Sequence, residues 1–288
     1  MSKIIITKLF FSVCVLDMSV LSLEPIAFVL DLDNTIVGDV SYQTILYNIE
    51  CAMKKNNIKC KADKMLLESY KPTSRLMRPF FRYFIMGMKK CFPNALFYVY
   101  TASEKNWAHK EIGLIEKTHG FKFARPLFTR DDCIVDSYGQ YRKSIKKVMP
   151  KMKKFTELLI IDNNKTFIDY GTNFLQCPDY DYILYMNVWD KMKKEYLRIM
   201  EINSIINNLI NTNKICKHCE SDIKPTDGKQ LEQMHKWLYK KHKKLNSINK
   251  KYLNDVFWKT LTNAIIDKKI TTFDKNNVEY LQSLFKID

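Results

Sequence analysis

Two aspartates and a threonine follow one apolar run at alternating positions. The segment Ile26-Ala-Phe-Val-Leu-Asp31-Leu-Asp33-Asn-Thr35 places Asp31, Asp33 and Thr35 on every second residue. Alternate side chains of an extended chain point to the same side, so we expect all three to emerge together where a buried strand gives way to a loop. Two carboxylates at such a place can supply a nucleophile and bind a metal ion.

Two further apolar runs end in polar groups. The second ends in Thr101-Ala-Ser103 and the third in Asp162-Asn163. Parallel sheets bind ligands outside the carboxyl ends of their strands, so the three endings are predicted to converge on one cleft. One D-x-D-x-T pattern alone would indicate only a turn. Three strands with such endings favour catalysis.

The chain resembles the haloacid dehalogenase superfamily, and within it the phosphatases of the FCP/SCP type that act on the C-terminal domain of RNA polymerase II. The resemblance covers about residues 24–205. It departs from the subgroup's pattern at Asn34, where Glu is common, and at Asn164-Lys165, where Ser-Pro is common. The motifs that carry it occur in the family's order and near its spacing: Asp31-Leu-Asp33-Asn-Thr35, Met77-Arg78-Pro79, Tyr100-Thr101-Ala102-Ser103, Leu127-Phe128-Thr-Arg130-Asp-Asp-Cys133, Gly139-Gln-Tyr141-Arg-Lys143 and Ile161-Asp162-Asn163.

This resemblance implies the roles of the catalytic residues. Asp31 is expected to attack phosphorus in line and become an aspartyl-phosphate. Asp33 is expected to protonate the departing oxygen and then to take a proton from the attacking water. Thr101 is expected to hydrogen-bond a phosphate oxygen, while Lys143 neutralises charge in the transition state. A lone lysine is ordinarily a surface residue, and only the surrounding motif assigns Lys143 this role.

The resemblance also implies a Mg²⁺ ion and a set of substrate contacts. A hard cation with oxygen ligands suits the residues at the strand ends, and the lack of a His/Cys cluster around them argues against zinc. The expected metal ligands are Asp31, Asp33 through its backbone carbonyl, Asp162 and Asn163. Substrate binding is expected of Thr35, Ser103 and Arg130.

Strand and helix patterns alternate along the chain. They predict an α/β fold with a doubly wound, mainly parallel sheet and helices on both faces, of the haloacid dehalogenase type. Helices are expected over 41–55, 77–90, from Thr101 to about 119, and from the turn at 137–140 through 154. About sixty residues separate Thr35 from Ala95. That leaves too little chain for a large cap, so we expect an open cleft.

The sequence divides into three predicted regions. Residues 1–23 form an N-terminal extension of uncertain role, 24–206 the phosphatase domain, and 207–288 a lysine-rich helical extension that serves packing or partner binding. Lys8 and Asp17 interrupt the apolar N-terminus, which favours an extra strand or helix over a signal peptide. No stretch is apolar enough for a confident membrane span, so an intracellular location is expected.

The eight cysteines are scattered, which is typical of reduced thiols rather than of a disulfide framework. Cys216-Lys-His218-Cys219 suits one half of a zinc site. The downstream histidines His235 and His242 lie farther away than finger spacing allows, and no second C-x-x-C pair follows. Metal binding and simple packing therefore both stay open for this motif.

The formal net charge of +16 implies acidic partners. Lysine-rich stretches at 143–154, 191–194 and 236–251 could follow a nucleic-acid backbone or could form solvated helical faces. The leading hypothesis is a Mg²⁺-dependent phosphoserine/phosphothreonine protein phosphatase, with the RNA polymerase II C-terminal domain as one candidate substrate. The alternatives are a nucleic-acid end (3′) phosphatase and a non-catalytic scaffold of the same fold. Retention of the catalytic set counts against the scaffold.

Overall fold

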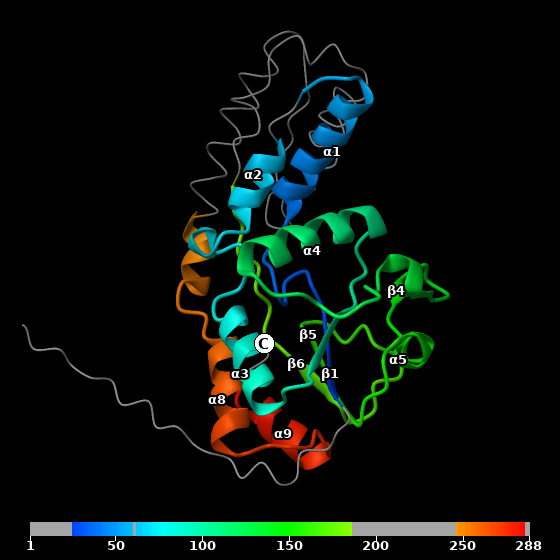
Figure 1. Cartoon of the computed structure of the whole chain (residues 1–288), viewed down its shortest axis with the longest axis vertical. Coiled ribbons are helices and arrows are strands. Elements are labelled where there is room, and N and C mark those ends of the chain that lie inside the picture. The colour runs from blue at the N-terminus through cyan, green and yellow to red at the C-terminus, as the bar shows by residue number, and fades with distance from the viewer. Residues whose placement is uncertain (1–24, 60–61, 186–245, 286–288) are drawn as a thin grey trace, which may run out of the picture.

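The computed structural model describes residues 25–59, 62–185 and 246–285 of the 288-residue chain (Figure 1). Predictions for residues 1–23, for the lysine stretch 191–194 and for most of 236–251 lie outside the described residues. The same holds for the Cys216/Cys219 pair.

A parallel four-stranded sheet forms the centre of the molecule, with strand order β2-β1-β5-β6. Its strands are β1 Ile26–Leu30, β2 Leu96–Val99, β5 Glu157–Asp162 and β6 Phe174–Gln176. The three apolar runs of the sequence correspond to β1, β2 and β5, so the predicted parallel α/β fold is confirmed. The edge strand β6 was not predicted, because three residues carry no periodic pattern.

Both faces of the sheet are covered. Successive strand residues point to opposite faces, and every residue of β1 is buried. Phe28 and Leu30 belong to a core cluster that includes residues of α3 Phe81–Cys91, α8 Phe257–Asp267 and α9 Lys275–Ser283. The intervening residues Ala27 and Val29 face a smaller cluster with α5 Ile145–Val148. Figure 1 shows α3, α8 and α9 on one side of the sheet and α5 on the other.

Three more helices lie at the carboxyl end of the sheet. They are α1 Ser41–Lys55, α2 Ala62–Ser69 and α4 Lys105–His119. The α1/α2 pair projects beyond α4 in Figure 1, and the Tyr47 ring packs 5.4 Å from that of Trp107 on α4. A short 3-10 helix, Pro72–Ser74, precedes α3. The described residues between Thr35 and Ala95 thus hold small helices and no large cap.

Two predicted helices differ from the observed ones. The helix expected over 77–90 begins only at Phe81, because a residue before proline avoids the helical region and Phe80 has φ of 64°. The helix expected through residue 154 is short: α5 is followed by the 3-10 helix Met149–Lys151, where Pro150 lacks a backbone donor. Strands β3 Ile134–Val135 and β4 Tyr141–Arg142 form the hairpin around the predicted turn.

The aromatic stripe around α3 was expected in the core, and two of its five residues lie there. Phe81 and Phe84 are buried, whereas Phe80, Tyr83 and Met86 are exposed. A helix that packs on one side buries one stripe only, so consecutive large side chains divide between core and surface.

The described C-terminal residues share the core of the central sheet. Trp258 of α8 is fully buried, with its ring 4.9 Å from Phe81 and 4.7 Å from Phe84. Phe273 lies 5.6 Å from Phe28 of β1. The predicted boundary at residue 207 lies outside the described residues and stays a prediction, but residues 246–285 pack as part of the same body.

Among the described residues, no helix combines the length and the apolar character that crossing a bilayer requires.

The position of Trp258 yields a stability prediction. Trp258→Ala should lower the free energy of unfolding by roughly 3–5 kcal/mol, because it leaves a large cavity between α3 and α8. Asp267→Ala on the exposed end of α8 is the matched control and should stay within about 0.5 kcal/mol of the unsubstituted protein. Urea denaturation measures both. Equal midpoints for the two variants would show that α8 is not part of the folding core.

Glu111 yields a second prediction. It is fully buried on α4 and accepts a 2.7 Å hydrogen bond from Tyr70. Burial and the charge of Asp33 raise its pKa well above 4.5, although the Tyr70 bond opposes this. A carboxyl group whose pKa is higher in the folded than in the unfolded protein destabilises the fold as the pH rises above its unfolded-state pKa of 4.5. Glutamine does not ionise, so above pH 4.5 the melting temperature of Glu111→Gln should rise relative to that of the wild type.

Thermal melts across pH, with the exposed Glu68→Gln as control, test this prediction. A Glu111→Gln difference that does not change with pH would contradict it.

Candidate active site

The loop after β1 turns sharply and fixes Asp31 and Thr35. The Asp31 amide donates to the Ile161 carbonyl at 2.9 Å, which keeps this residue in register with β5. The Leu32 carbonyl then accepts hydrogen bonds from the amides of Thr35, Ile36 and Val37. Asn34 has φ of 60°, a conformation that Asn tolerates better than most residues. The departure from Glu at this position therefore suits the turn.

Lys143 lies between two carboxylates from different strands. Its ammonium group contacts Asp31 Oδ1 and lies 2.7 Å from Asp162 Oδ2, and all three side chains are buried. The backbone of Lys143 pairs with Thr166 and Ile168, which sets the direction of the side chain. The structure thus brings together Asp31, Lys143 and Asp162, as the sequence predicted.

Thr35 joins the nucleophile candidate to the third strand end. Its hydroxyl oxygen lies 3.1 Å from both Asp31 Oδ2 and Asn163 Oδ1, and it accepts a bond from the Asn163 amide. Thr35 is fully buried. Thr35 therefore links Asp31 to Asn163. The substrate contact expected of Thr35 stays a prediction.

Asp33 has a different environment from Asp31. Its Oδ2 accepts hydrogen bonds from Ser103 at 2.6 Å and from Thr101 at 3.3 Å. Its Oδ1 is buried and has no hydrogen-bond partner among the described residues. Asp31 therefore contacts the Lys143 ammonium, whereas the Asp33 side chain accepts its hydrogen bonds from two hydroxyl groups.

The electrostatics of the cluster follow from burial. Burial and the nearby charge of Asp162 raise the pKa of Asp31 to about 7, against the opposing effect of Lys143. Burial also raises the pKa of Asp33, and the Ser103 hydrogen bond opposes that rise. Burial lowers the pKa of Lys143, but the charges of Asp162 and Asp31 outweigh it and hold the ammonium in its charged form.

Arg130 lies at the solvent-facing edge of the site. Its Nε donates to the Ala102 carbonyl at 2.8 Å, and its backbone amide donates to Ser103 O at 3.0 Å. The guanidinium carbon lies 5.0 Å from the Tyr141 ring centre. These contacts fix the guanidinium beside the loop that carries Ser103.

Several residues that support the site were not among the predicted site residues. Asp169 accepts hydrogen bonds from Ser144 Oγ and the Ile145 backbone amide, and so holds the turn next to Lys143. Asp179 Oδ1 accepts from Asn163 Nδ2 at 2.7 Å, and Gln176 Nε2 donates to the Asn163 carbonyl at 3.0 Å. Nothing in the sequence pointed to Asp179 or Gln176, because strand β6 itself was not recognised.

The donor set fits a hard cation. Two carboxylates, Asp31 and Asp162, and the amide oxygen of Asn163 meet here, and Mg²⁺ is commonly held by one or two carboxylates together with water. In residues 25–59, 62–185 and 246–285, no three His, Cys, Asp or Glu side chains converge as a metal-binding group. A site made of two carboxylates, an amide and water is therefore what these residues offer.

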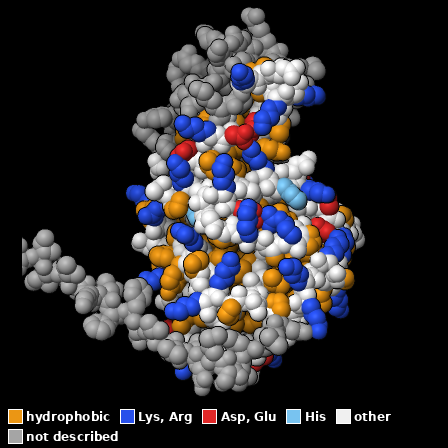
Figure 2. All heavy atoms as spheres, viewed as in Figure 1, with side chains coloured by type: hydrophobic (Ala, Val, Ile, Leu, Met, Phe, Trp, Pro, Cys, Tyr) orange, Lys and Arg blue, Asp and Glu red, His pale blue; other side chains and the backbone are white. Residues whose placement is uncertain are grey.

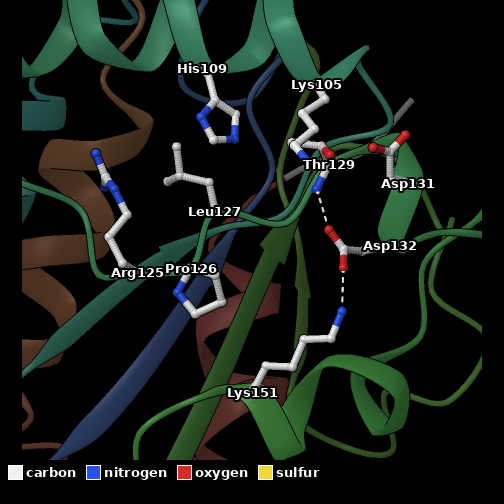
Figure 3. A pocket seen from close by; sticks show the side chains of 9 residues that line it. All are labelled: Lys105, His109, Arg125, Pro126, Leu127, Thr129, Asp131, Asp132 and Lys151. Carbon is white, nitrogen blue, oxygen red and sulfur yellow. Dashed lines mark hydrogen bonds and ion pairs between the residues drawn. The ribbon is translucent and has the colours of Figure 1, made fainter.

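A separate pocket of about 370 Å³ lies beside this site (Figure 3). None of the predicted catalytic or metal-binding residues lines it. The Asp132 carboxylate accepts hydrogen bonds from the Thr129 backbone amide and from the Lys151 ammonium, as the dashed lines in Figure 3 show. Its lining residues are Lys105, His109, Arg125, Pro126, Leu127, Thr129, Asp131, Asp132 and Lys151.

The solved structures similar to this chain include two of Fcp1, both of low identity. The Fcp1 structure described as an essential RNA polymerase II CTD phosphatase is 16% identical, with 85% of this chain and 66% of that chain covered and a TM-score of 0.35. A fission yeast RNA polymerase II CTD phosphatase Fcp1 variant bound to beryllium fluoride is 15% identical, with the same coverages and a TM-score of 0.34.

A phosphoserine phosphohydrolase-like protein from Francisella tularensis subsp. tularensis SCHU S4 is 15% identical, with 53% of this chain and 86% of that chain covered and a TM-score of 0.32. The chain spans just under two thirds of the Fcp1 chains. At these identities and TM-scores the likenesses carry no functional information.

Sequence comparison gives the decisive result. No curated protein sequence matches significantly. A family model described as NLI interacting factor-like phosphatase matches residues 26–213, which is more than half of the chain and contains every predicted site residue. The chain therefore belongs to the NLI interacting factor-like phosphatases, the FCP-type family within the haloacid dehalogenase superfamily.

Proposed function

We propose that this chain is a Mg²⁺-dependent phosphoserine/phosphothreonine protein phosphatase that works through an aspartyl-phosphate. The observation that supports this most strongly is the contrast between two neighbouring carboxylates. Asp31 contacts the Lys143 ammonium, and Asp33 accepts hydrogen bonds from the hydroxyl groups of Ser103 and Thr101. Two carboxyl groups in unlike environments can take unlike roles, one as nucleophile and the other as acid and base.

Asp31 is the proposed nucleophile. One carboxylate oxygen forms a bond to phosphorus while the bond from phosphorus to the seryl or threonyl oxygen breaks. Lys143 lies against this carboxylate and can neutralise negative charge that builds up on the phosphoryl oxygens. Thr35 and Lys143 together fix the direction of attack.

Asp33 is the proposed general acid and base. Its raised pKa favours the protonated form, and its Oδ1 has no described partner that would compete for the proton. Asp33 gives this proton to the departing oxygen. It then takes one from the water that hydrolyses the aspartyl-phosphate, and this restores the Asp31 carboxylate.

The proposed Mg²⁺ ligands are the side chains of Asp31, Asp162 and Asn163 and the backbone carbonyl of Asp33. When bound, the ion would stabilise the ionised form of Asp31 and polarise a phosphoryl oxygen. The protein's own part is to present these oxygens together, since Thr35 links Asp31 to Asn163 and Lys143 links Asp31 to Asp162.

A phosphate on a protein loop fits the accessible edge of the site. Asp33, Ser103 and Arg130 are partly exposed, whereas Asp31, Thr101 and Lys143 are buried. Arg130 is proposed to contact the phosphate, and the net charge of +16 favours acidic phosphoproteins such as the RNA polymerase II tail. On the face shown in Figure 2, lysine and arginine side chains are spread out rather than gathered in one groove. This distribution gives the nucleic-acid alternative no particular support.

Asp31→Asn should abolish turnover of phosphopeptide and of a small aryl phosphate, because an amide of nearly the same size is a poor nucleophile. The melting temperature should stay close to that of the wild type. Asp131→Asn, in the exposed turn, is the matched control and should keep wild-type activity. Near-normal hydrolysis by purified Asp31→Asn would remove Asp31 from the mechanism.

Arg130→Ala should lower kcat/KM for a phosphoserine peptide by roughly ten- to a hundredfold, because a charge-assisted contact of about 1.5 to 3 kcal/mol is lost. Arg82→Ala on the exposed side of α3 is the control and should leave kcat/KM unchanged. Steady-state kinetics with phosphopeptide and with a 3′-phosphorylated oligonucleotide, side by side, measure the effect.

The same panel decides between the protein and nucleic-acid readings. Neutralising Lys240, Lys241, Lys243 and Lys244 together should matter little for a short peptide, since charges beyond about 8 Å are screened. Salt-sensitive loss of oligonucleotide hydrolysis in that variant, with no phosphopeptide hydrolysis by the wild type, would favour the end-phosphatase instead.

A further inference from the structure

The described C-terminal residues 246–285 lie outside the family match of 26–213, yet they contact the support of the proposed active site. The contact is made through residues 176–183, which begin with the last residue of edge strand β6 and continue into the loop after it. We call residues 176–183 the β6 loop. Figure 1 shows α8 and α9 packed next to β6 and α3.

Side-chain amides from the C-terminal residues hold the two ends of the β6 loop. The backbone amide of Gln176 donates to Gln282 Oε1 at 2.8 Å, and Gln282 Nε2 donates to the backbone carbonyl of Gln176 at 3.0 Å. At the other end Asn249 makes the same pair of bonds with the backbone of Ile183, at 2.8 and 2.7 Å. Each amide thus replaces a neighbouring strand at an otherwise open backbone edge.

A buried ion pair holds the middle of the β6 loop. Asp255 accepts two hydrogen bonds from Arg78, at 3.1 and 2.8 Å, and the third arm of Arg78 donates to the Pro178 carbonyl at 2.8 Å. The Arg78 side chain is fully buried, and its guanidinium carbon lies 4.6 Å from the Phe257 ring centre. Hydrogen bonds between charged groups of this kind are stronger than neutral ones.

The β6 loop in turn contacts two parts of the proposed site. Gln176 and Asp179 hydrogen-bond the backbone carbonyl and the side-chain amide of Asn163. The Tyr180 amide donates to the Asn34 carbonyl at 2.9 Å, next to Asp33. Gly38, in the segment between β1 and α1, approaches the β6 loop so closely that a Cβ added to it would lie 2.0 Å from the Tyr182 carbonyl oxygen.

We propose that residues 246–285 are a built-in positioning element for the metal side of the active site, with Gln282 and Asp255 as positioning residues. They fix the β6 loop, and the loop fixes the orientation of Asn163 and of the Asp33–Asn34 turn. The inference rests on the proposed function, because it takes Asn163 as a metal ligand. Partners that orient metal ligands commonly change metal affinity when they are removed.

Gln282→Met tests this in the full-length protein. It keeps the side-chain length and removes both bonds to Gln176, while Glu279→Gln, on the exposed side of the same helix, is the matched control. Mn²⁺ binding in the absence of substrate, followed by electron paramagnetic resonance of the free ion, should weaken by roughly three- to tenfold in Gln282→Met and not in the control. The Mg²⁺ concentration for half-maximal activity should rise likewise, with kcat at saturating Mg²⁺ nearly unchanged.

Gln282→Glu keeps the acceptor for the Gln176 backbone amide but sets a charged carboxylate oxygen against the Gln176 carbonyl, so its Mn²⁺ affinity should also fall below that of the wild type. It decides the question if Gln282→Met does not fold. Asp255→Asn should weaken Mn²⁺ binding in the same direction. Wild-type affinity in folded Gln282 variants would overturn the positioning role alone, whereas a wild-type protein that neither binds Mn²⁺ nor hydrolyses phosphopeptide would overturn the proposed function and this inference with it.

Discussion

The buried contact of Lys143 with Asp31 and Asp162 is the interaction around which the proposed site is organised. Two carboxylates brought together at the ends of β1 and β5 would repel each other in a medium that solvates charge poorly. One ammonium group between them offsets part of that repulsion. A buried ion pair of this kind adds little net stability compared with apolar packing, because desolvation offsets the Coulomb attraction. Its value lies in fixing the positions of groups from three segments of the chain.

A second constraint is the separation of Asp31 from Asp33 into unlike surroundings. The loop after β2 supplies the hydroxyl groups of Thr101 and Ser103 to Asp33, and the turn before α5 supplies Lys143 to Asp31. Asp31 and Asp33, two positions apart after one strand, therefore make their hydrogen bonds to two different loops. The hydrogen bonds of the two carboxyl groups are therefore set separately, although the charge of Asp33 still raises the pKa of Asp31.

The C-terminal residues extend the catalytic body beyond the family match. Trp258 and Phe273 complete the core on one face of the sheet, and Gln282 covers the open backbone edge of β6. An uncovered edge strand invites pairing with other chains, so this covering also protects the sheet. The same contacts hold the β6 loop against Asn163. Packing, edge protection and site geometry thus depend on one segment.

The sequence by itself determined the strands that end at the site and the chemistry placed there. Each apolar run is a local pattern, and so are the polar residues that end it, such as Asp31, Asp33, Thr101 and Asp162. A local pattern can be recognised from a short stretch of sequence alone. The late start of α3 after Pro79 and the early end of α5 before Pro150 were equally local matters, but the expected helix lengths overlooked them. Only the tertiary structure decided that Thr35 links Asp31 to Asn163, that Asp179 and Gln176 contact Asn163, and that Asp255 and Gln282 contact the segment that carries them. The bond from Gln282 to Gln176 joins residues 106 positions apart, and that from Arg78 to Asp255 joins residues 177 apart. Contacts over such separations leave no periodic trace in the sequence, because they exist only once the chain has folded around its core.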